Sequence, residues 1–470
     1  MKLFLSFILF ASFSIAQHTH SLHHSLQEYI RNYTKIKELP GVVAGVALGD
    51  SLFFATGSGY SSLELQVPAD TNSVFRIASI SKFITGIAVM ILVEQGKLSL
   101  EKPIKTWLPD IPADKANITI PQLLSHTSGL RAYRDGEFHS VKKFNSTTEV
   151  YNFLKNDALE AKPGEKYIYS TLAYTFVSKI IENVTGKSFG DFLQEAIFTK
   201  AGMHSTRLDV QEHIVKGRAY GYYKNAQREF INAPLADLSI KYPGGGVLST
   251  LPDLLRLGKA LAARVLLTDS SLTRMMQPTR LNNGEIKSYG LGVDVKTDAK
   301  GREFIGHFGG GTGFVSNIII YPKEHYVAAH LINCVDRNNT NPADELLGIA
   351  LNERHTNISI PAGDVFLASL KKNPHISTDS LYSVLEESTQ YDMSEQQIIW
   401  SAVDYAKYGT ALSATNFLKT AIQHYPKSAV LYLALAETYE ADGNTGLARR
   451  NYLKVLEFDP NNQKAKQKTQ

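Results

Sequence analysis

One stretch of the sequence, Phe75 to Gly96, is too apolar to lie at a protein surface. It begins Phe-Arg-Ile-Ala-Ser-Ile-Ser-Lys and continues with mostly apolar residues up to Glu94. We expect a buried helix that ends after Gln95, because glycine is the residue most often found just beyond a helix C-terminus. The rest of the chain must then be organised around this helix.

Ser79 and Lys82 stand three residues apart at the start of this stretch. On a helix they project from one face about one turn apart, at the positive end of the helix dipole. A serine hydroxyl becomes a nucleophile when a base lies within hydrogen-bond reach, and a lysine serves when burial and nearby charge lower its pKa. The pair therefore predicts an activated serine. The alternative is an ordinary surface helix start, since Ser-x-x-Lys is a common pattern.

The composition is that of a globular protein with room for two or three domains: 470 residues, of which 43% are hydrophobic and 20% charged. The net charge is only +4 and no long run of like charge occurs. Nothing therefore predicts a nucleic acid or an anionic membrane as a partner. The single cysteine, Cys334, excludes an internal disulfide and lies in an apolar run that predicts a buried strand.

Residues 1–16 are predicted to be a signal peptide. Lys2 supplies the positive start, Leu3 to Ile15 the apolar run, and Ser14-Ile-Ala16 a small-x-small cleavage site. We therefore expect an exported chain, periplasmic or secreted, that begins near Gln17. No later stretch reaches the roughly 18 apolar residues that a membrane span needs.

The pattern of strands and helices predicts an α+β domain. Gly41 to Tyr60 resembles a hairpin, and helical periodicity dominates from Ile118 to about Gly202. We expect an antiparallel sheet built from both ends of the domain, with helices packed on it and an inserted helical subdomain. Strand patterns return late in the domain at Tyr289 to Val295, Glu303 to His307, Gly313 to Tyr321 and Tyr326 to Val335.

Two further segments carry polar groups that suit catalysis. In the first, the turn at Lys162-Pro-Gly precedes Tyr169, whose phenol could act as a base or proton relay. The second is a glycine-rich run from Gly306 to Gly313, in which His307 is the only ionisable side chain; glycines let a backbone approach a substrate closely. Taken singly, Tyr169 could be a core tyrosine and the glycine run a flexible turn.

Together, three motifs resemble those of the serine penicillin-recognising enzymes, whose pattern is Ser-x-x-Lys, Ser-Asp-Asn and Lys-Thr-Gly. They are Ser79 to Lys82, Tyr169-Ser-Thr171 and His307-Phe-Gly309. The resemblance is closest to the class C β-lactamase branch, in which a tyrosine heads the second motif. It covers roughly Leu26 to Asn352 and includes flanking segments at Leu123 to Leu130, Gly244 to Thr250 and Tyr289 to Gly292.

The resemblance implies a β-lactamase/transpeptidase-like fold over residues 17–355 and a role for each motif residue. Ser79 would be acylated, Lys82 and Tyr169 would share its proton, and His307 would take the cationic or hydrogen-bonding place of the third motif. The backbone N–H groups of Ser79 and Gly310 would form the oxyanion hole. No metal or organic cofactor is implied. Further substrate-binding positions would be Thr171, Phe308 and Gly309.

Two departures from the family pattern bear on the substrate. Thr171 stands where β-lactamases usually have asparagine, and Phe308 stands where a threonine would bind the β-lactam carboxylate. We therefore expect a serine hydrolase of amides or esters, acting on a small molecule or a peptide, with poor hydrolysis of the β-lactam nitrocefin. The alternative is a catalytically silent penicillin-binding-type receptor or sensor.

The chain changes character after the predicted hydrolase domain. Residues 356–393 are predicted to be a linker with a helix at Asp379 to Glu387, and residues 394–466 to be two tetratricopeptide-like repeats. These repeats would either dock on the rest of the chain or bind a protein partner. The repeats are inferred because Gly409, Ala414 and Pro426 recur 34 residues on as Gly443, Ala448 and Pro460, and Tyr405 recurs as Tyr439.

Overall fold

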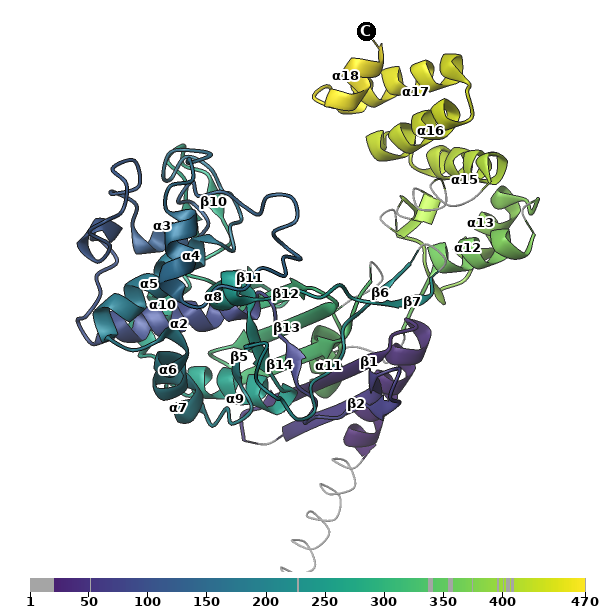
Figure 1. Cartoon of the computed structure of the whole chain (residues 1–470). Coiled ribbons are helices and arrows are strands. Elements are labelled where there is room, and N and C mark those ends of the chain that lie inside the picture. Colours follow the sequence, from purple (N-terminus) through teal and green to yellow (C-terminus); the bar gives the residue numbers. More distant parts are fainter. Residues whose placement is uncertain are drawn as a thin grey trace, which may run out of the picture. The chain divides into compact units, whose positions relative to one another are not determined.

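The computed structural model describes residues 21–469 except 51, 226–227, 337–340, 354–357, 374, 395–396, 400, 403–405 and 407–409. The chain divides into two compact units (Figure 1). Unit 1 runs from the start of the chain to Tyr223 and includes Phe230–Thr356, and unit 2 consists of Lys224–Glu229 with Asn357–Gln470. The predicted signal peptide, residues 1–16, lies outside the described residues.

Unit 1 is built on a seven-stranded antiparallel sheet with the order β11-β12-β13-β14-β1-β2-β3. Strand β1 (Gly41–Leu48) pairs with β2 (Leu52–Ser62) on one side and with β14 (Tyr326–Ile332) on the other. The two ends of the domain therefore meet in one sheet, which confirms the predicted α+β fold. The remaining strands are β3 (Val67–Pro68), β11 (Asp294–Thr297), β12 (Glu303–Gly311) and β13 (Phe314–Tyr321).

The strand predicted over Tyr289 to Val295 begins later than expected. Strand β11 starts at Asp294, because Gly290 to Val293 form a tight turn in which the Gly290 N–H donates to the Val293 carbonyl. Gly292 has a φ of +81°, which a residue with a side chain rarely adopts. Gly290 and Gly292 therefore interrupt the extended backbone that the alternation of apolar residues had predicted.

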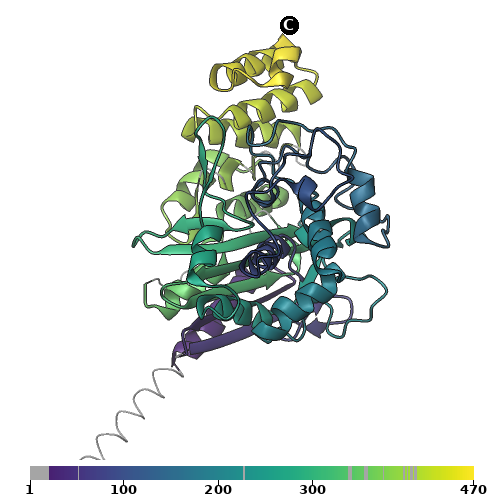
Figure 2. The same cartoon turned by 90° about the vertical axis from the view of Figure 1, so that its left-hand side faces the viewer.

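Helix α2 (Ile80–Glu94) is the buried helix predicted from the sequence. Every residue from Ile80 to Leu92 is buried, and the helix ends at Gln95 before Gly96, which has a φ of +68°. Figure 2 shows the helix nearly end-on, inside unit 1. It packs against α5 (Ala173–Thr185), α8 (Tyr242–Gly245) and β12. Its N-terminus therefore meets the sheet and the helical part of the unit at one place.

Further helices cover the sheet and form the inserted subdomain. Both α9 (Leu251–Ala262) and α11 (Pro342–Ala350) pack on the central strands β1, β13 and β14. The chain is helical at 21–36, and the other helices of unit 1 are η1 (Ile104–Thr106), α3 (Ile120–Leu124), α4 (Thr147–Leu154), α6 (Phe189–Leu193), η2 (Gln194–Phe198), α7 (Thr199–Ala201), η3 (Ser239–Lys241) and α10 (Asp269–Met275).

Short strands connect these layers. One small sheet has the order β4-β8-β5, so that β4, which directly precedes the Ser79 turn, is held by β8. Cys334 lies in a buried position of β15, as its apolar surroundings predicted. The short strands are β4 (Phe75–Arg76), β5 (Arg207–Leu208), β6 (Tyr222–Lys224), β7 (Phe230–Asn232), β8 (Val247–Ser249), β9 (Thr279–Arg280), β10 (Ile286–Lys287) and β15 (Cys334–Val335).

Unit 2 is mainly helical. Residues 356–393, predicted to hold one helix, contain two, α12 (Ala362–Lys372) and α13 (Thr378–Glu386), together with the short strands β16 (Ile360–Pro361) and β17 (Tyr391–Asp392). Pro361 is the N-cap residue of α12. The remaining helices are α15 (Ala411–His424), α16 (Ala429–Ala441), α17 (Thr445–Phe458) and α18 (Gln463–Thr469).

The two tetratricopeptide-like repeats stay a prediction. Successive helices α15 to α18 pack on their neighbours, and the repeated alanines, Ala414 and Ala448, are both buried. The first-repeat positions Tyr405 and Gly409 lie outside the described residues. The tail is therefore a helical stack whose assignment to that repeat family rests on the sequence period.

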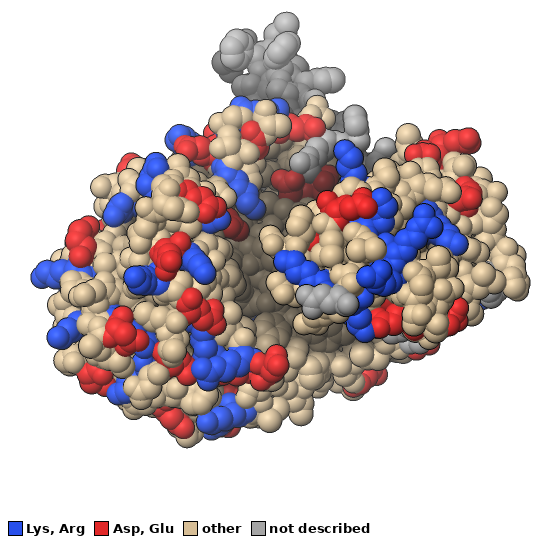
Figure 3. Space-filling view, turned by 90° about the horizontal axis from the view of Figure 1, so that it is seen from above, with Lys and Arg blue, Asp and Glu red and all other residues tan. Residues whose placement is uncertain are grey.

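The surface carries both signs of charge. In Figure 3 acidic and basic side chains lie interspersed over most of the face shown, in keeping with the net charge of +4. Within the part of the chain that the structure describes, no helix is long and apolar enough to cross a membrane.

Truncation tests the independence of unit 1. A chain that ends near residue 355 is expected to fold, because the main hydrophobic core runs from Val43 to Leu331 and the helical tail has a separate core. Circular dichroism and labelling by a fluorophosphonate probe, compared with the full-length chain, measure this. Aggregation of the shortened chain would mean that the tail covers an apolar face.

Candidate active site

The N-terminus of α2 holds Ser79 and Lys82 in direct contact. The Lys82 Nζ donates to the Ser79 Oγ at 2.9 Å and to the carbonyl of Gly244 at 2.7 Å. Lys82 is fully buried, and burial, together with the charge of Lys241, holds its pKa well below the usual value. Among the described residues no carboxylate lies within ion-pair distance of Lys82. The structure thus gives Ser79 a neighbouring amine that is poised to lose its proton.

The backbone before the serine is strained. Ala78 has a φ of +44°, in the left-handed region that residues with a Cβ avoid. This turn separates β4 from α2 and aims Ser79 at the end of the helix. Such strain persists only where the surrounding structure imposes it, and it is common at functional sites.

Tyr169 completes the contact around Ser79. Its phenol hydrogen-bonds the Ser79 side chain, and the Lys82 Nζ lies 4.8 Å from the centre of its ring. Tyr169 is 40% exposed, so it lines the open side of the site. Burial of part of the group raises its pKa to about 12, and the phenol therefore keeps its proton at neutral pH. The structure brings together the first two motifs as predicted from the sequence.

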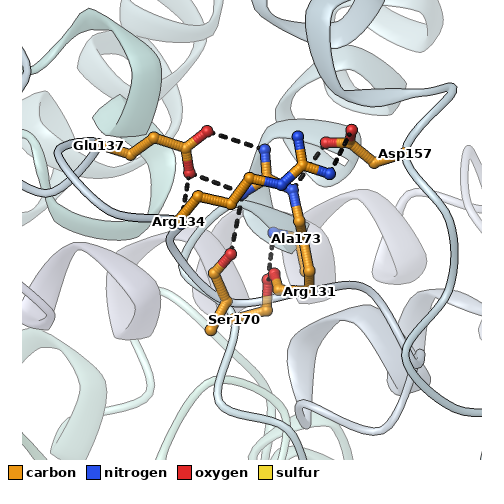
Figure 4. Close-up of polar contacts among 7 residues, drawn as sticks. Arg131, Arg134, Glu137, Asp157, Ser170 and Ala173 are labelled. Carbon is orange, nitrogen blue, oxygen red and sulfur yellow. Dashed lines mark hydrogen bonds and ion pairs between the residues drawn. The ribbon is translucent and has the colours of Figure 1, made fainter.

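A buried ion network holds the second motif in place (Figure 4). The Ser170 hydroxyl donates to the carbonyl of Arg131 at 2.5 Å and accepts from the Ala173 N–H at 3.1 Å. Arg131, with 6% of its side chain exposed, pairs with Glu137 at 2.6 Å and with Asp157 at 2.7 Å. The network ties the turn before α5 to the loop that follows α3. Sequence reasoning missed these residues, because Arg131 is far from Asp157 along the chain.

His126 is a second feature that sequence reasoning missed. Its Nδ1 accepts from the Ser170 N–H at 3.1 Å, and its ring lies 4.1 Å from that of Tyr169. Burial keeps its pKa well below the usual value, so the ring is neutral. The only sequence signal was its position in a flanking segment that resembles the family pattern.

His307 is buried near Lys82, and its ring is neutral. Its Nδ1 is 2.6 Å from the carbonyl of Phe308 and its Nε2 is 2.8 Å from the Tyr289 hydroxyl. A carbonyl only accepts, so Nδ1 donates and Nε2 accepts from Tyr289. Burial, reinforced by the charge of Lys82, lowers the pKa of His307 to about 3. Of the two roles expected for it, cationic or hydrogen-bonding, the geometry is compatible with the second.

The glycines of the third motif bring β12 against the start of α2. A Cβ built on Gly309 would lie 2.5 Å from the Ile77 carbonyl oxygen and 3.2 Å from the Ser79 nitrogen. Only glycine permits this approach, which places the backbone of Gly309 beside Ser79. A Cβ on Gly310 would meet nothing closer than a ring carbon of Phe308 at 3.7 Å.

Phe308 points away from Ser79. Side chains on a strand alternate between its two faces, so Phe308 and Gly310 share one face. A Cβ on Gly310 would meet the Phe308 ring, whereas a Cβ on Gly309 would point toward Ser79. Phe308 is 53% exposed and lines a cavity of about 400 Å³ with Asp294 and His330. Its role as a substrate-binding residue stays a prediction. Thr171, also predicted to bind substrate, is buried beside Gly244 and hydrogen-bonds Tyr133. Its binding role stays a prediction as well.

Gly309 offers a direct test of this packing. Gly309→Ala is expected to lower the melting temperature and to reduce acylation of Ser79, because its Cβ would also fall 2.2 Å from the Ser316 Oγ. Overpacking of this kind typically costs about 1–3 kcal/mol. Gly310→Ala is the matched control and should leave the melting temperature near that of the wild type. Equal stability of the two variants in thermal unfolding would contradict the close approach of β12.

The fold and the contacts of Ser79 with Lys82 and Tyr169 match the pattern expected of the penicillin-recognising serine hydrolases. The family model described as Beta-lactamase matches residues 26–352, and the chain therefore belongs to the beta-lactamase family, whose members include serine hydrolases and penicillin-binding proteins. Among the described residues, no group of three or more His, Cys, Asp or Glu is arranged to hold a metal.

Two curated proteins illustrate the relationship. The Homo sapiens serine beta-lactamase-like protein LACTB, mitochondrial, is 30% identical over 291 residues, 47% of this chain and 53% of that protein. The chain thus spans about half the length of this relative. Penicillin-binding protein 4* of Bacillus subtilis (strain 168) is 30% identical over 323 residues, 66% of this chain and 71% of its own length.

Solved structures agree on the fold. D-amino acid amidase from Ochrobactrum anthropi SV3 superposes with a TM-score of 0.63 at 23% identity, covering 71% of this chain and 100% of the amidase. The octameric penicillin-binding protein homologue from Pyrococcus abyssi gives a TM-score of 0.60 at 24% identity, over 74% of this chain and 81% of the homologue. At these identities the likeness establishes the fold alone.

Proposed function

We propose that this protein is an exported serine hydrolase that forms an acyl-enzyme at Ser79 on an amide or ester substrate. The observation that carries the proposal is the hydrogen bond from the Lys82 Nζ to the Ser79 Oγ at 2.9 Å, made by a fully buried lysine. Burial, with no carboxylate among the described residues within ion-pair distance, favours the neutral amine, which is the form that can take the serine proton.

Acylation would begin with proton transfer from Ser79 and end with cleavage of the bond between the carbonyl carbon and the leaving group. The Ser79 oxygen attacks the substrate carbonyl as its proton moves to the amine of Lys82, and the tetrahedral oxyanion is held by the N–H groups of Ser79 and Gly310. Tyr169, whose phenol contacts Ser79, then passes a proton to the leaving amine or alcohol and regains one from Lys82. Water would hydrolyse the ester by the reverse sequence of transfers.

The substrate class follows from the third motif. The neutral His307 brings no positive charge to the place where the family pattern has lysine, and Phe308 brings no hydroxyl. A β-lactam carboxylate would therefore lack two of its usual partners. This supports amides and esters over β-lactams, as does the fold shared with an amidase.

A fluorophosphonate probe followed by a hydrolysis screen tests the proposal. The probe is expected to label the wild type and a Ser99→Ala control, in which a serine outside the site is removed, but not Ser79→Ala. The screen compares p-nitrophenyl esters, D-amino-acid amides, peptides and nitrocefin. Labelling without turnover of any substrate would favour the silent receptor, and absence of labelling would refute the serine nucleophile.

Export is tested separately. Expression in a Gram-negative bacterium should give a periplasmic or secreted chain whose N-terminus is near Gln17. An intact Met1 on the cytoplasmic protein would contradict the predicted signal peptide.

A further inference from the structure

Lys241 is a second buried lysine beside the candidate site. It lies in η3, and only 4% of the residue is exposed. Its Nζ donates to the carbonyl of Phe138 at 2.7 Å and lies 4.3 Å from the centre of the Phe138 ring. Among the described residues no carboxylate lies within ion-pair distance of it. Burying a charged amine without a paired anion costs folding free energy, so a lysine in this position is expected to serve a function.

The two lysines border the same turn. The Lys82 Nζ donates to the carbonyl of Gly244, and the Lys241 Cδ lies 3.9 Å from the point where a Cβ on Gly245 would be. Thr171 packs against that turn with its methyl group. The turn Gly244-Gly245 therefore brings the base of the first motif and Lys241 to one place, although the two lysines are far apart in the sequence.

Among the described residues neither lysine is paired with a carboxylate, although Asp209 pairs with the Arg76 beside Lys241 and Asp294 acts on the tyrosines that face Lys82. Lys82 faces Ser79, Tyr169, Tyr174 and the two neutral histidines, His126 and His307. Arg76, His139 and Tyr133 lie around Lys241, and Asp237, on the same segment, accepts hydrogen bonds from the N–H and hydroxyl of Ser239. Burial and the charge of Arg76 lower the pKa of Lys241 to about 8, so it is largely protonated at neutral pH.

In the family pattern a lysine heads the third motif, and here that position is His307. We propose that Lys241, in the segment before Gly244, supplies near Lys82 a positive charge that His307 lacks, and that it is a positioning residue acting through Lys82 and not a partner of a substrate carboxylate. Its charge would keep Lys82 in the amine form at neutral pH. This inference rests on the proposed function, since it concerns the base of that reaction.

Loss of the Lys241 charge would shift the pH dependence in a defined direction. Protonated Lys241 disfavours a second positive charge on Lys82 and lets Lys82 act as a base at lower pH. Removing the charge raises the pKa of Lys82, so the acid limb of the kcat/KM profile moves to higher pH. A like charge in a site of effective dielectric constant near 20 shifts a pKa by on the order of one unit.

The test is the pH dependence of p-nitrophenyl acetate hydrolysis by full-length variants. Lys241→Met is expected to move the midpoint of the acid limb upward by about one pH unit, with the rate recovering at high pH. Lys241→Arg, always charged, should keep the wild-type midpoint. Lys105→Met, at an exposed lysine in η1, is the control for loss of a lysine elsewhere. If Lys241→Met does not fold, Lys241→Gln removes the charge and keeps a donor for Phe138.

The outcomes separate this inference from the proposed function. A rate lowered by the same factor at every pH would overturn it, because a purely structural role leaves the midpoint unchanged. A raised KM for anionic esters with an unmoved midpoint would overturn it in favour of binding a substrate carboxylate. Absence of Ser79 labelling in the wild type would instead overturn the proposed function itself.

Discussion

Ser79→Ala is expected to abolish turnover while leaving the protein folded. The hydroxyl makes the covalent bond to the substrate, and loss of a nucleophile of this kind lowers kcat by at least about three orders of magnitude. The fold should tolerate the change, because the side chain is small and its contacts are the hydrogen bonds with Lys82 and Tyr169. Steady-state hydrolysis of the best ester or amide from the screen measures the rate.

The control for this variant is its thermal unfolding, which should resemble that of the wild type. Mass spectrometry of the wild type after substrate addition should find the acyl group on the peptide that contains Ser79. Activity of Ser79→Ala above a few per cent of the wild-type rate would contradict the assignment of the nucleophile and, with it, the proposed mechanism.

Lys82→Ala and Tyr169→Phe are each expected to lower the acylation rate by roughly 100- to 10,000-fold, the range for loss of a proton-transfer group. The two side chains contact the same hydroxyl, since the Lys82 Nζ lies 2.9 Å from the Ser79 Oγ and the Tyr169 phenol also bonds it. Groups that act as one unit do not contribute independently. The double variant should therefore be little slower than the slower single variant.

Single-turnover kinetics with a p-nitrophenyl ester measure all three rates under one set of conditions. A double variant whose loss equals the product of the two single losses would mean that Lys82 and Tyr169 act independently. Tyr151→Phe is a useful comparison, because its hydroxyl donates to the Asp110 carboxylate, outside the site. Its effect should be confined mainly to stability.

Local sequence pattern was sufficient for the main elements of unit 1. The apolar run after Lys82 predicted α2, and glycine after Gln95 predicted its end, because helix termination depends on a few neighbouring residues. Alternation of apolar residues predicted the late strands in the same way. It failed at Tyr289 to Val293, where backbone freedom at Gly290 and Gly292 allows a turn that no periodicity reveals. It also missed α12, although Phe366, Leu367 and Leu370 stand at helical spacing and are buried.

The sequence by itself determined which groups could react: the spacing of Ser79 and Lys82 on one helix face is a property of the helix alone. The tertiary structure decided their chemical state, because a pKa depends on burial and on charges brought from distant parts of the chain. Thus Lys82 is fully buried beside Gly244, His307 is neutral, and Phe308 points away from Ser79. Lys241 and the Arg131 network reach the site only through folding, since their partners lie far off in sequence.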